Sequence, residues 1–179
     1  MPWNSTSFIN STSTWFFSLA DKLENETAQT IADTYLTSAV ASQTFFAATP
    51  NNLKQPAVIQ QGFNESFNIA KSLNDGKLTV DVWLPAANSI ITFWTGTSFN
   101  LTLPPGGLAG ISNTVISAGL AISLAADLKT AFEQDTGIDS ALKLNEAFVK
   151  HLSTINGLWV GTAPGAPPPP LSVSWTGLT

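Results

Sequence analysis

Four consecutive prolines constrain the fold of this chain more than any other feature of its sequence. Pro167, Pro168, Pro169 and Pro170 each fix the backbone φ angle and lack an amide hydrogen, so this run cannot continue a helix or a central strand. Proline runs favour an extended polyproline II rod. The sequence therefore predicts an extended Pro-rich C-terminal arm over residues 163–179, outside the core, with Trp175 in its apolar tip.

The sequence before this arm has the composition of one globular domain. The chain has 179 residues, of which 44% are hydrophobic and 11% are charged, and this length allows one sizeable core. We predict an N-terminal arm over residues 1–13 and a core domain over residues 14–162.

Helical periodicity occurs in four parts of the predicted core. Apolar residues spaced by three and four positions predict a long amphipathic helix over residues 14–46, with a break expected near Asn25. Pro56 is suited to the first turn of a second helix that extends to residue 75. A third helix is predicted from Ser112 or Asn113 to residue 134, and a fourth over residues 139–155.

Strand patterns lie between the second and third predicted helices. Residues 77–84 alternate between apolar and polar side chains, and residues 90–103 are rich in β-branched and aromatic types. These segments predict a small antiparallel sheet of two or three strands. The order of elements, helices before and after a sheet, predicts an α+β fold with about four helices.

Charge and cysteine content exclude several classes of function. All seven basic residues are lysine, against twelve carboxylates, and the net charge is -5. We expect no sequence-specific binding to nucleic acid, because the field has the wrong sign and arginine contacts are absent. The chain has no cysteine, which excludes disulfides, thiolate nucleophiles and most structural zinc sites.

Two sequence features bear on membranes and secretion. The first residues lack a basic start followed by an apolar run, so no signal peptide is predicted. Residues 107–126 are apolar enough to suggest a membrane span, but Ser, Asn and Thr interrupt them and no lysine flanks their amino-terminal side. A buried helix explains this segment better, and no membrane partner is predicted.

Motifs with catalytic or metal-binding chemistry are weak. His151 has no second histidine or cysteine to complete a metal site or a triad, so we interpret it as a helix-surface residue. Asp135-Thr136-Gly137 matches the short aspartic-protease signature, but it falls between two predicted helices. A calcium loop over residues 135–146 fails at Ser140, where the sharp turn needs glycine. We predict no catalytic residue, no metal site, no cofactor and no enzymatic activity.

Tryptophans are the remaining candidates for a functional site. Trp83 is placed on the polar face of its predicted strand. A free monomer that exposed such rings to water would tend to aggregate. At an interface the same rings serve as anchors. The predicted partner-binding residues are Trp3, Trp159, Pro167, Pro168, Pro169, Pro170 and Trp175.

Three sequence patterns resemble the small virion structural proteins of tailed phages, especially those of cyanobacterial myophages. They are the Pro2-Trp3 opening with its Ser/Thr/Asn-rich continuation, Phe93-Trp94-x-Gly96 followed by Pro104-Pro105-Gly106, and His151-x-x-x-Ile155-x-Gly157-Leu158-x-x-Gly161-Thr162 leading through prolines to Trp175-x-Gly177. The similarity extends over most of the chain as a pattern.

This resemblance implies a non-enzymatic virion component of the neck or tail. It implies a head-to-tail connector, tail terminator or tail completion protein that is made in the host cytoplasm and located in the virion. The implied partners are further copies of the chain, in a ring, and neighbouring virion proteins. A carbohydrate- or receptor-binding module of a virion and a capsid decoration protein are the alternatives.

Overall fold

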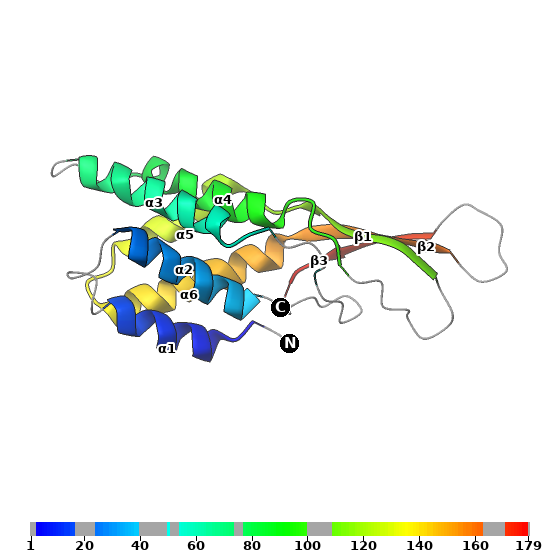
Figure 1. The fold of residues 1–179 in the computed structure, drawn as a ribbon, viewed down its shortest axis with the longest axis horizontal. Coiled ribbons are helices and arrows are strands. Elements are labelled where there is room, and N and C mark those ends of the chain that lie inside the picture. Colours follow the sequence, from blue (N-terminus) through cyan, green and yellow to red (C-terminus); the bar gives the residue numbers. More distant parts are fainter. Residues whose placement is uncertain are drawn as a thin grey trace.

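The computed structural model describes residues 3–16, 24–39, 50, 54–73, 77–99, 109–162 and 171–178. Within these residues the chain forms helices and one antiparallel sheet, which confirms the α+β class, although six α-helices are present where about four were predicted. The sheet projects from one end of the helical part (Figure 1). The elements are α1 (Ser5–Phe16), α2 (Glu24–Ala39), α3 (Ala57–Ser72), the 3-10 helix η2 (Val80–Trp83), α4 (Leu84–Trp94), β1 (Ala109–Ser117), α5 (Ala121–Phe132), α6 (Gly137–Thr154), β2 (Asn156–Thr162) and β3 (Leu171–Thr176).

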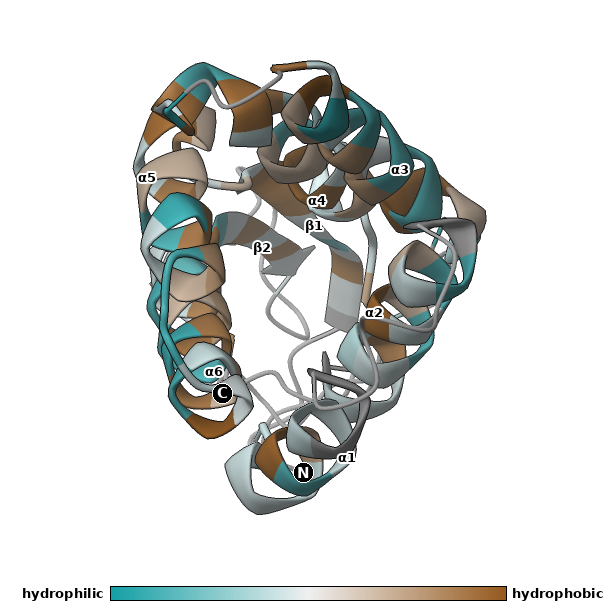
Figure 2. Cartoon of the chain, turned by 90° about the vertical axis from the view of Figure 1, so that its left-hand side faces the viewer, coloured by the Kyte–Doolittle hydropathy of each residue, from teal (hydrophilic) through white to brown (hydrophobic). Residues whose placement is uncertain are grey.

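The six helices close on one another in chain order. Each of them contacts the next one along the chain, and α1 also contacts α6. An end-on view shows them around a shared interior, with α5 and α6 on one side and α2 and α3 on the other (Figure 2). Because each helix has two helical neighbours, an apolar stripe on each is enough to fill the interior.

Aromatic rings fill the centre of this helical part. Tyr35 of α2 is fully buried, and its ring centroid lies 4.8 Å from that of Phe148 of α6. The Nε1 atom of Trp94 donates a hydrogen bond of 2.7 Å to the Tyr35 hydroxyl oxygen. Burial raises the pKa of Tyr35, and the bond from Trp94 opposes this in part. The buried phenol therefore has a partner and costs little to enclose.

The N-terminal boundary of the core differs from the prediction. Helix α1 begins at Ser5, within the segment 1–13 that was predicted as an arm, and Asn4 caps it because its Oδ1 accepts a hydrogen bond of 3.0 Å from the Ser7 amide. Phe8 is fully buried. The prediction of a separate arm is therefore wrong for residues 3–13. The long helix predicted over residues 14–46 corresponds to the end of α1 and to α2, and the remaining positions lie outside the described residues.

The predicted strands over residues 77–84 and 90–103 are wrong where the structure describes them. Residues 80–94 form η2 and then α4, with Pro85 in the first turn of the helix. The adjacent side chains of Val82 and Trp83 are both buried, which an alternating strand does not permit. Only Ser98 and Phe99 make isolated bridges, to Thr114 and Pro50, and residues 100–103 lie outside the described part.

The third predicted helix is a strand followed by a shorter helix. Residues 109–117 form β1, and α5 begins at Ala121. Gly119 makes the turn between them with a φ angle of 85°, a conformation that favours glycine. The apolar segment 107–126 is therefore not one helix where it is described, and no described helix is long and apolar enough to cross a membrane.

The sheet has the order β1-β2-β3, with both pairs antiparallel. Two register shifts leave Ile111 and Ile116 of β1 without a Cα partner on β2, whereas β3 pairs with β2 without a shift. Residues 171–176 were predicted to lie in the extended arm, outside the core, and this is wrong because they complete the sheet. Residues 163–170 of that arm lie outside the described part.

Candidate functional site

The predicted tryptophans are covered by the chain itself. Trp159 of β2 is 1% exposed and Trp175 of β3 is 4% exposed. Trp3 is half-buried against the core, and its Nε1 donates a hydrogen bond of 2.8 Å to Oδ1 of Asn145. The structure does not bring these three rings together as one surface, and the four predicted prolines, Pro167 to Pro170, lie outside the described residues.

Trp175 packs against Phe99 and over Gly157 in the sheet. Its ring meets Phe99 edge to face, with centroids 5.6 Å apart, and its Nε1 donates a hydrogen bond of 2.8 Å to the buried Oδ1 of Asn113. A Cβ at Gly157 would lie 2.1 Å from the indole, so only glycine leaves room for the ring there. Trp175 is therefore a core residue of this chain.

Two further sequence interpretations are corrected by burial. Trp83 is 2% exposed and stacks on Phe132, with ring centroids 4.3 Å apart and planes inclined by 11°. His151 is 4% exposed and is not a helix-surface residue. Within the described residues no three His, Asp or Glu side chains are grouped so that they could hold a metal ion.

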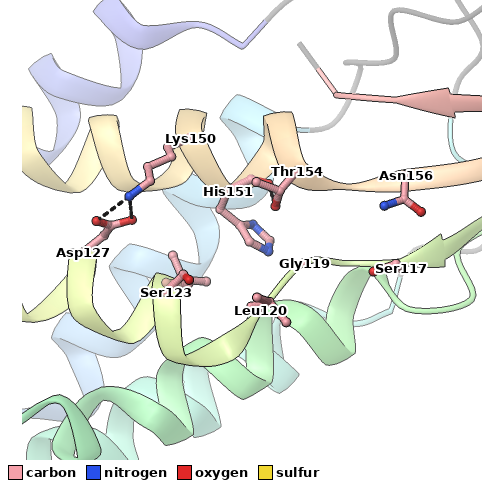
Figure 3. A pocket seen from close by; sticks show the side chains of 10 residues that line it. Ser117, Gly119, Leu120, Ser123, Asp127, Lys150, His151, Thr154 and Asn156 are labelled. Carbon is pink, nitrogen blue, oxygen red and sulfur yellow. Dashed lines mark hydrogen bonds and ion pairs between the residues drawn. The ribbon is translucent and has the colours of Figure 1, made fainter.

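His151 is located in the wall of a pocket of about 280 Å³ between α5, α6 and the start of β2 (Figure 3). Gly119 brings the turn after β1 close to α6, and a Cβ at this position would lie 2.6 Å from Oγ1 of Thr154. The close approach of these elements forms the pocket. Its lining residues are Ser117, Gly119, Leu120, Ser123, Leu124, Asp127, Lys150, His151, Thr154 and Asn156.

The pocket contains a serine, a histidine and an aspartate, but their contacts do not make a triad. Nε2 of His151 donates a hydrogen bond of 2.7 Å to the Ala118 carbonyl oxygen, and Asp127 accepts two bonds from Lys150, at 2.9 and 2.7 Å. No bond links either pocket serine, Ser117 or Ser123, to His151 within the described part of the chain. A nucleophile needs a base within hydrogen-bond reach, so this geometry does not support acyl transfer.

Burial controls the chemistry of His151. It lowers the pKa of the imidazole below its ordinary value of 6.5, and the bond with the Ala118 carbonyl opposes this in part. Its Nδ1 atom is buried and has no hydrogen-bond partner among the described residues. Burial, together with the lack of a described partner for Nδ1, therefore favours the neutral form of the ring.

Apolar side chains are exposed beside this pocket. Ile116, Leu120 and Ile122 are 61%, 70% and 54% exposed, and together we call them the junction surface because they lie where β1 leads into α5. Sequence reasoning missed these residues. It placed all three in one helix from Ser112 or Asn113 to residue 134, and it interpreted the apolar segment 107–126 as a buried helix.

A second apolar surface lies on α6. Ile138, Leu142 and Val149 are each at least 39% exposed and follow one another at spacings that place them on one side of the helix. We call these three residues the α6 surface. The buried side chains of α6, which include Leu144 and Phe148, face the interior instead.

Neither the protein-family models nor the curated proteins nor the solved structures contain a significant match to this chain. The candidate site is therefore interpreted from its own geometry. That geometry consists of exposed apolar side chains next to a pocket whose lining includes the Asp127–Lys150 ion pair and the buried His151.

Proposed function

We propose that this chain is a non-enzymatic structural protein of a tailed-phage virion. Its place is in the neck or tail, as a connector, tail terminator or tail completion protein, and its copies form a ring. The resemblance in sequence pattern suggests the virion class. The observation that carries the ring is the presence of two different exposed apolar surfaces on one chain.

A ring requires two surfaces that differ and fit each other. In a head-to-tail contact each copy uses one surface toward the preceding copy and another toward the following one. The junction surface and the α6 surface come from different elements, and each offers three large apolar side chains. Pairing them removes both from water, which supplies the driving force for assembly.

The electrostatics of the chain agree with a location around DNA. A ring in the neck or tail surrounds a channel through which the duplex moves, and strong contacts to phosphate would hold the duplex in place. A net charge of -5 without arginine gives little attraction for phosphate. Retention of duplex DNA by the purified protein at low salt would contradict this part of the proposal.

The carbohydrate-binding alternative depends on exposed tryptophans. Trp83, Trp94, Trp159 and Trp175 are all between 1% and 4% exposed. No observation in the described residues therefore favours stacking on sugars. A capsid decoration protein differs from the proposed function only in its position on the virion.

The test is the mass and shape of the purified protein, measured by light scattering and negative-stain electron microscopy. We expect closed rings of identical copies. Leu120→Lys on the junction surface and Ile138→Lys on the α6 surface should each abolish the ring, whereas Gln61→Lys on the exposed face of α3 should leave it intact.

Mixing the two defective variants distinguishes head-to-tail contact from other geometries. A Leu120→Lys chain retains its α6 surface, and an Ile138→Lys chain retains its junction surface. Chains with different tags should therefore co-purify to a greater extent in this mixture than two tagged forms of either variant alone, and without forming rings. Absence of rings from the unmodified protein, or rings unaffected by both substitutions, would contradict the proposal.

A further inference from the structure

Strand β3 forms an unprotected edge of the sheet. One side of β3 pairs with β2, and no described strand pairs with its other side. Open edges usually carry charges, prolines or bulges that prevent strand addition. The segment Leu171–Thr176 contains no charged residue and no proline, and its pairing with β2 has no register shift. Within the described residues, nothing therefore pairs with the outer side of its backbone.

The opposite edge of the sheet is different. Strand β1 has two register shifts, at Ile111 and Ile116, which interrupt regular pairing. The amide of Phe99 donates to the Asn113 carbonyl oxygen, and the amide of Val115 donates to the Thr97 carbonyl oxygen. Backbone bonds from residues 97 and 99 thus already occupy part of the β1 edge. Strand β3, in contrast, pairs with β2 in a regular register.

The side chains of β3 indicate what its edge accepts. Ser172, Ser174 and Thr176 are exposed, and Val173 is 41% exposed, although it lies on the same face as the buried Trp175. Ser172 and Ser174 lie on the other face. When two copies of such an uncharged strand pair antiparallel, apolar side chains can lie opposite apolar ones and serines opposite serines.

A register centred on Val173 covers an exposed apolar side chain. If the pairing is centred on Val173, this residue lies opposite Val173 of the second copy, and Ser172 lies opposite Ser174. Val173 is a large hydrophobic residue of β3 whose side chain is exposed, and this register covers it with an identical side chain. A register centred on Ser174 would place Val173 against Trp175, which is already buried.

We propose that β3 pairs antiparallel with β3 of a second copy, about a two-fold axis at Val173, and joins two three-stranded sheets into one. This contact goes beyond the proposed ring, since it uses neither the junction surface nor the α6 surface. In a ring-forming protein it joins two rings face to face, and in a protein that forms no ring it gives a dimer.

The first experiment compares the mass of the full chain with that of Val173→Lys. Two lysines on the axis repel each other, so the mass should fall about twofold while circular dichroism stays unchanged. Val149→Lys is the matched control, because Val149 is 40% exposed and lies on the α6 surface. It should disrupt the ring but leave β3-paired dimers, so failure of the ring and failure of the edge contact are distinguishable.

Charge exchange tests the two-fold axis itself. Val173→Glu should lose the contact as Val173→Lys does, and a one-to-one mixture of the two variants should recover it, because Lys then faces Glu. A Val173→Cys chain has a single thiol and should form a symmetric disulfide under mild oxidation, whereas Val149→Cys should stay reduced. An unchanged mass for Val173→Lys, or a mixture that does not recover, would overturn the proposal.

Discussion

The indole nitrogen of Trp175 lies 2.8 Å from Oδ1 of Asn113, and this hydrogen bond joins the two outer strands of the sheet across the central one. Gly157 of the central strand pairs with Trp175 and has no side chain to obstruct the ring. The glycine, the asparagine and the indole therefore form one unit. This unit fixes β3 to the rest of the fold.

Replacing Asn113 should destabilise the fold. Asn113→Ala leaves the buried indole N–H of Trp175 without an acceptor, which costs about 1–3 kcal/mol of unfolding free energy. Urea denaturation followed by tryptophan fluorescence measures this loss. Ser112→Ala, one position earlier and on the other face of β1, is the control and should change stability little.

Adding a methyl group at Gly157 should displace β3. The new Cβ would lie 2.1 Å from the Trp175 ring and 2.5 Å from the Thr114 carbonyl oxygen, and the latter is backbone that cannot rotate away. We expect Gly157→Ala to cost about 1–3 kcal/mol. Ser174→Ala on the exposed face of β3 provides the comparison. Equal stability of the two variants would show that the sheet adjusts without cost.

Truncating Trp175 should lower the folding stability of the single chain, in addition to any effect on assembly. Because the ring is 4% exposed, Trp175→Ala should lower the unfolding free energy by about 3–5 kcal/mol. Thermal unfolding at low protein concentration, where copies are separate, measures this. A stable monomer with a defect in assembly alone would instead support the predicted role of Trp175 as a partner anchor.

The stability of the chain should depend on pH through His151. The unfolded imidazole has a pKa of about 6.5 and binds a proton before the folded one does, since burial lowers the folded pKa. Stability from this group is therefore complete above about pH 6.5 and decreases as the pH falls below it, by at most about 1.4 kcal/mol per pH unit.

His151→Gln tests this dependence, because glutamine does not titrate and retains a donor for the Ala118 carbonyl oxygen. Urea midpoints of both proteins between about pH 5 and pH 8 should diverge on the acidic side. Parallel curves would show that His151 does not contribute.

Local patterns in the sequence predict some elements well. Helix α6 was expected over residues 139–155 and forms at Gly137–Thr154, because its apolar stripe is regular and Thr136 caps it through the Asp139 amide. Residues 77–84 show the opposite. Their alternation is the pattern of a strand, but packing of Val82 and Trp83 into the helical core favours η2 and α4.

Pairing between distant segments could not be predicted in this way. The β-branched residues of β1 (Ile111, Thr114, Val115 and Ile116) suit a strand, but the strand's partner β2 begins 39 positions after β1 ends, from Ser117 to Asn156. The proline run suggested that the core ends before residue 163, yet Trp175 returns to Asn113 across 62 positions. The junction surface was missed for the same reason, since its exposure depends on where β1 stops.

The contact of α1 with α6 has a consequence for synthesis on the ribosome. Trp3 bonds to Asn145, 142 positions later, so the first helix emerges long before its partner exists. At about 5–20 residues per second, the wait is on the order of ten seconds. During that interval Phe8 and Trp3 lack their aromatic neighbour Phe148. The nascent chain therefore exposes these two apolar side chains to chaperones.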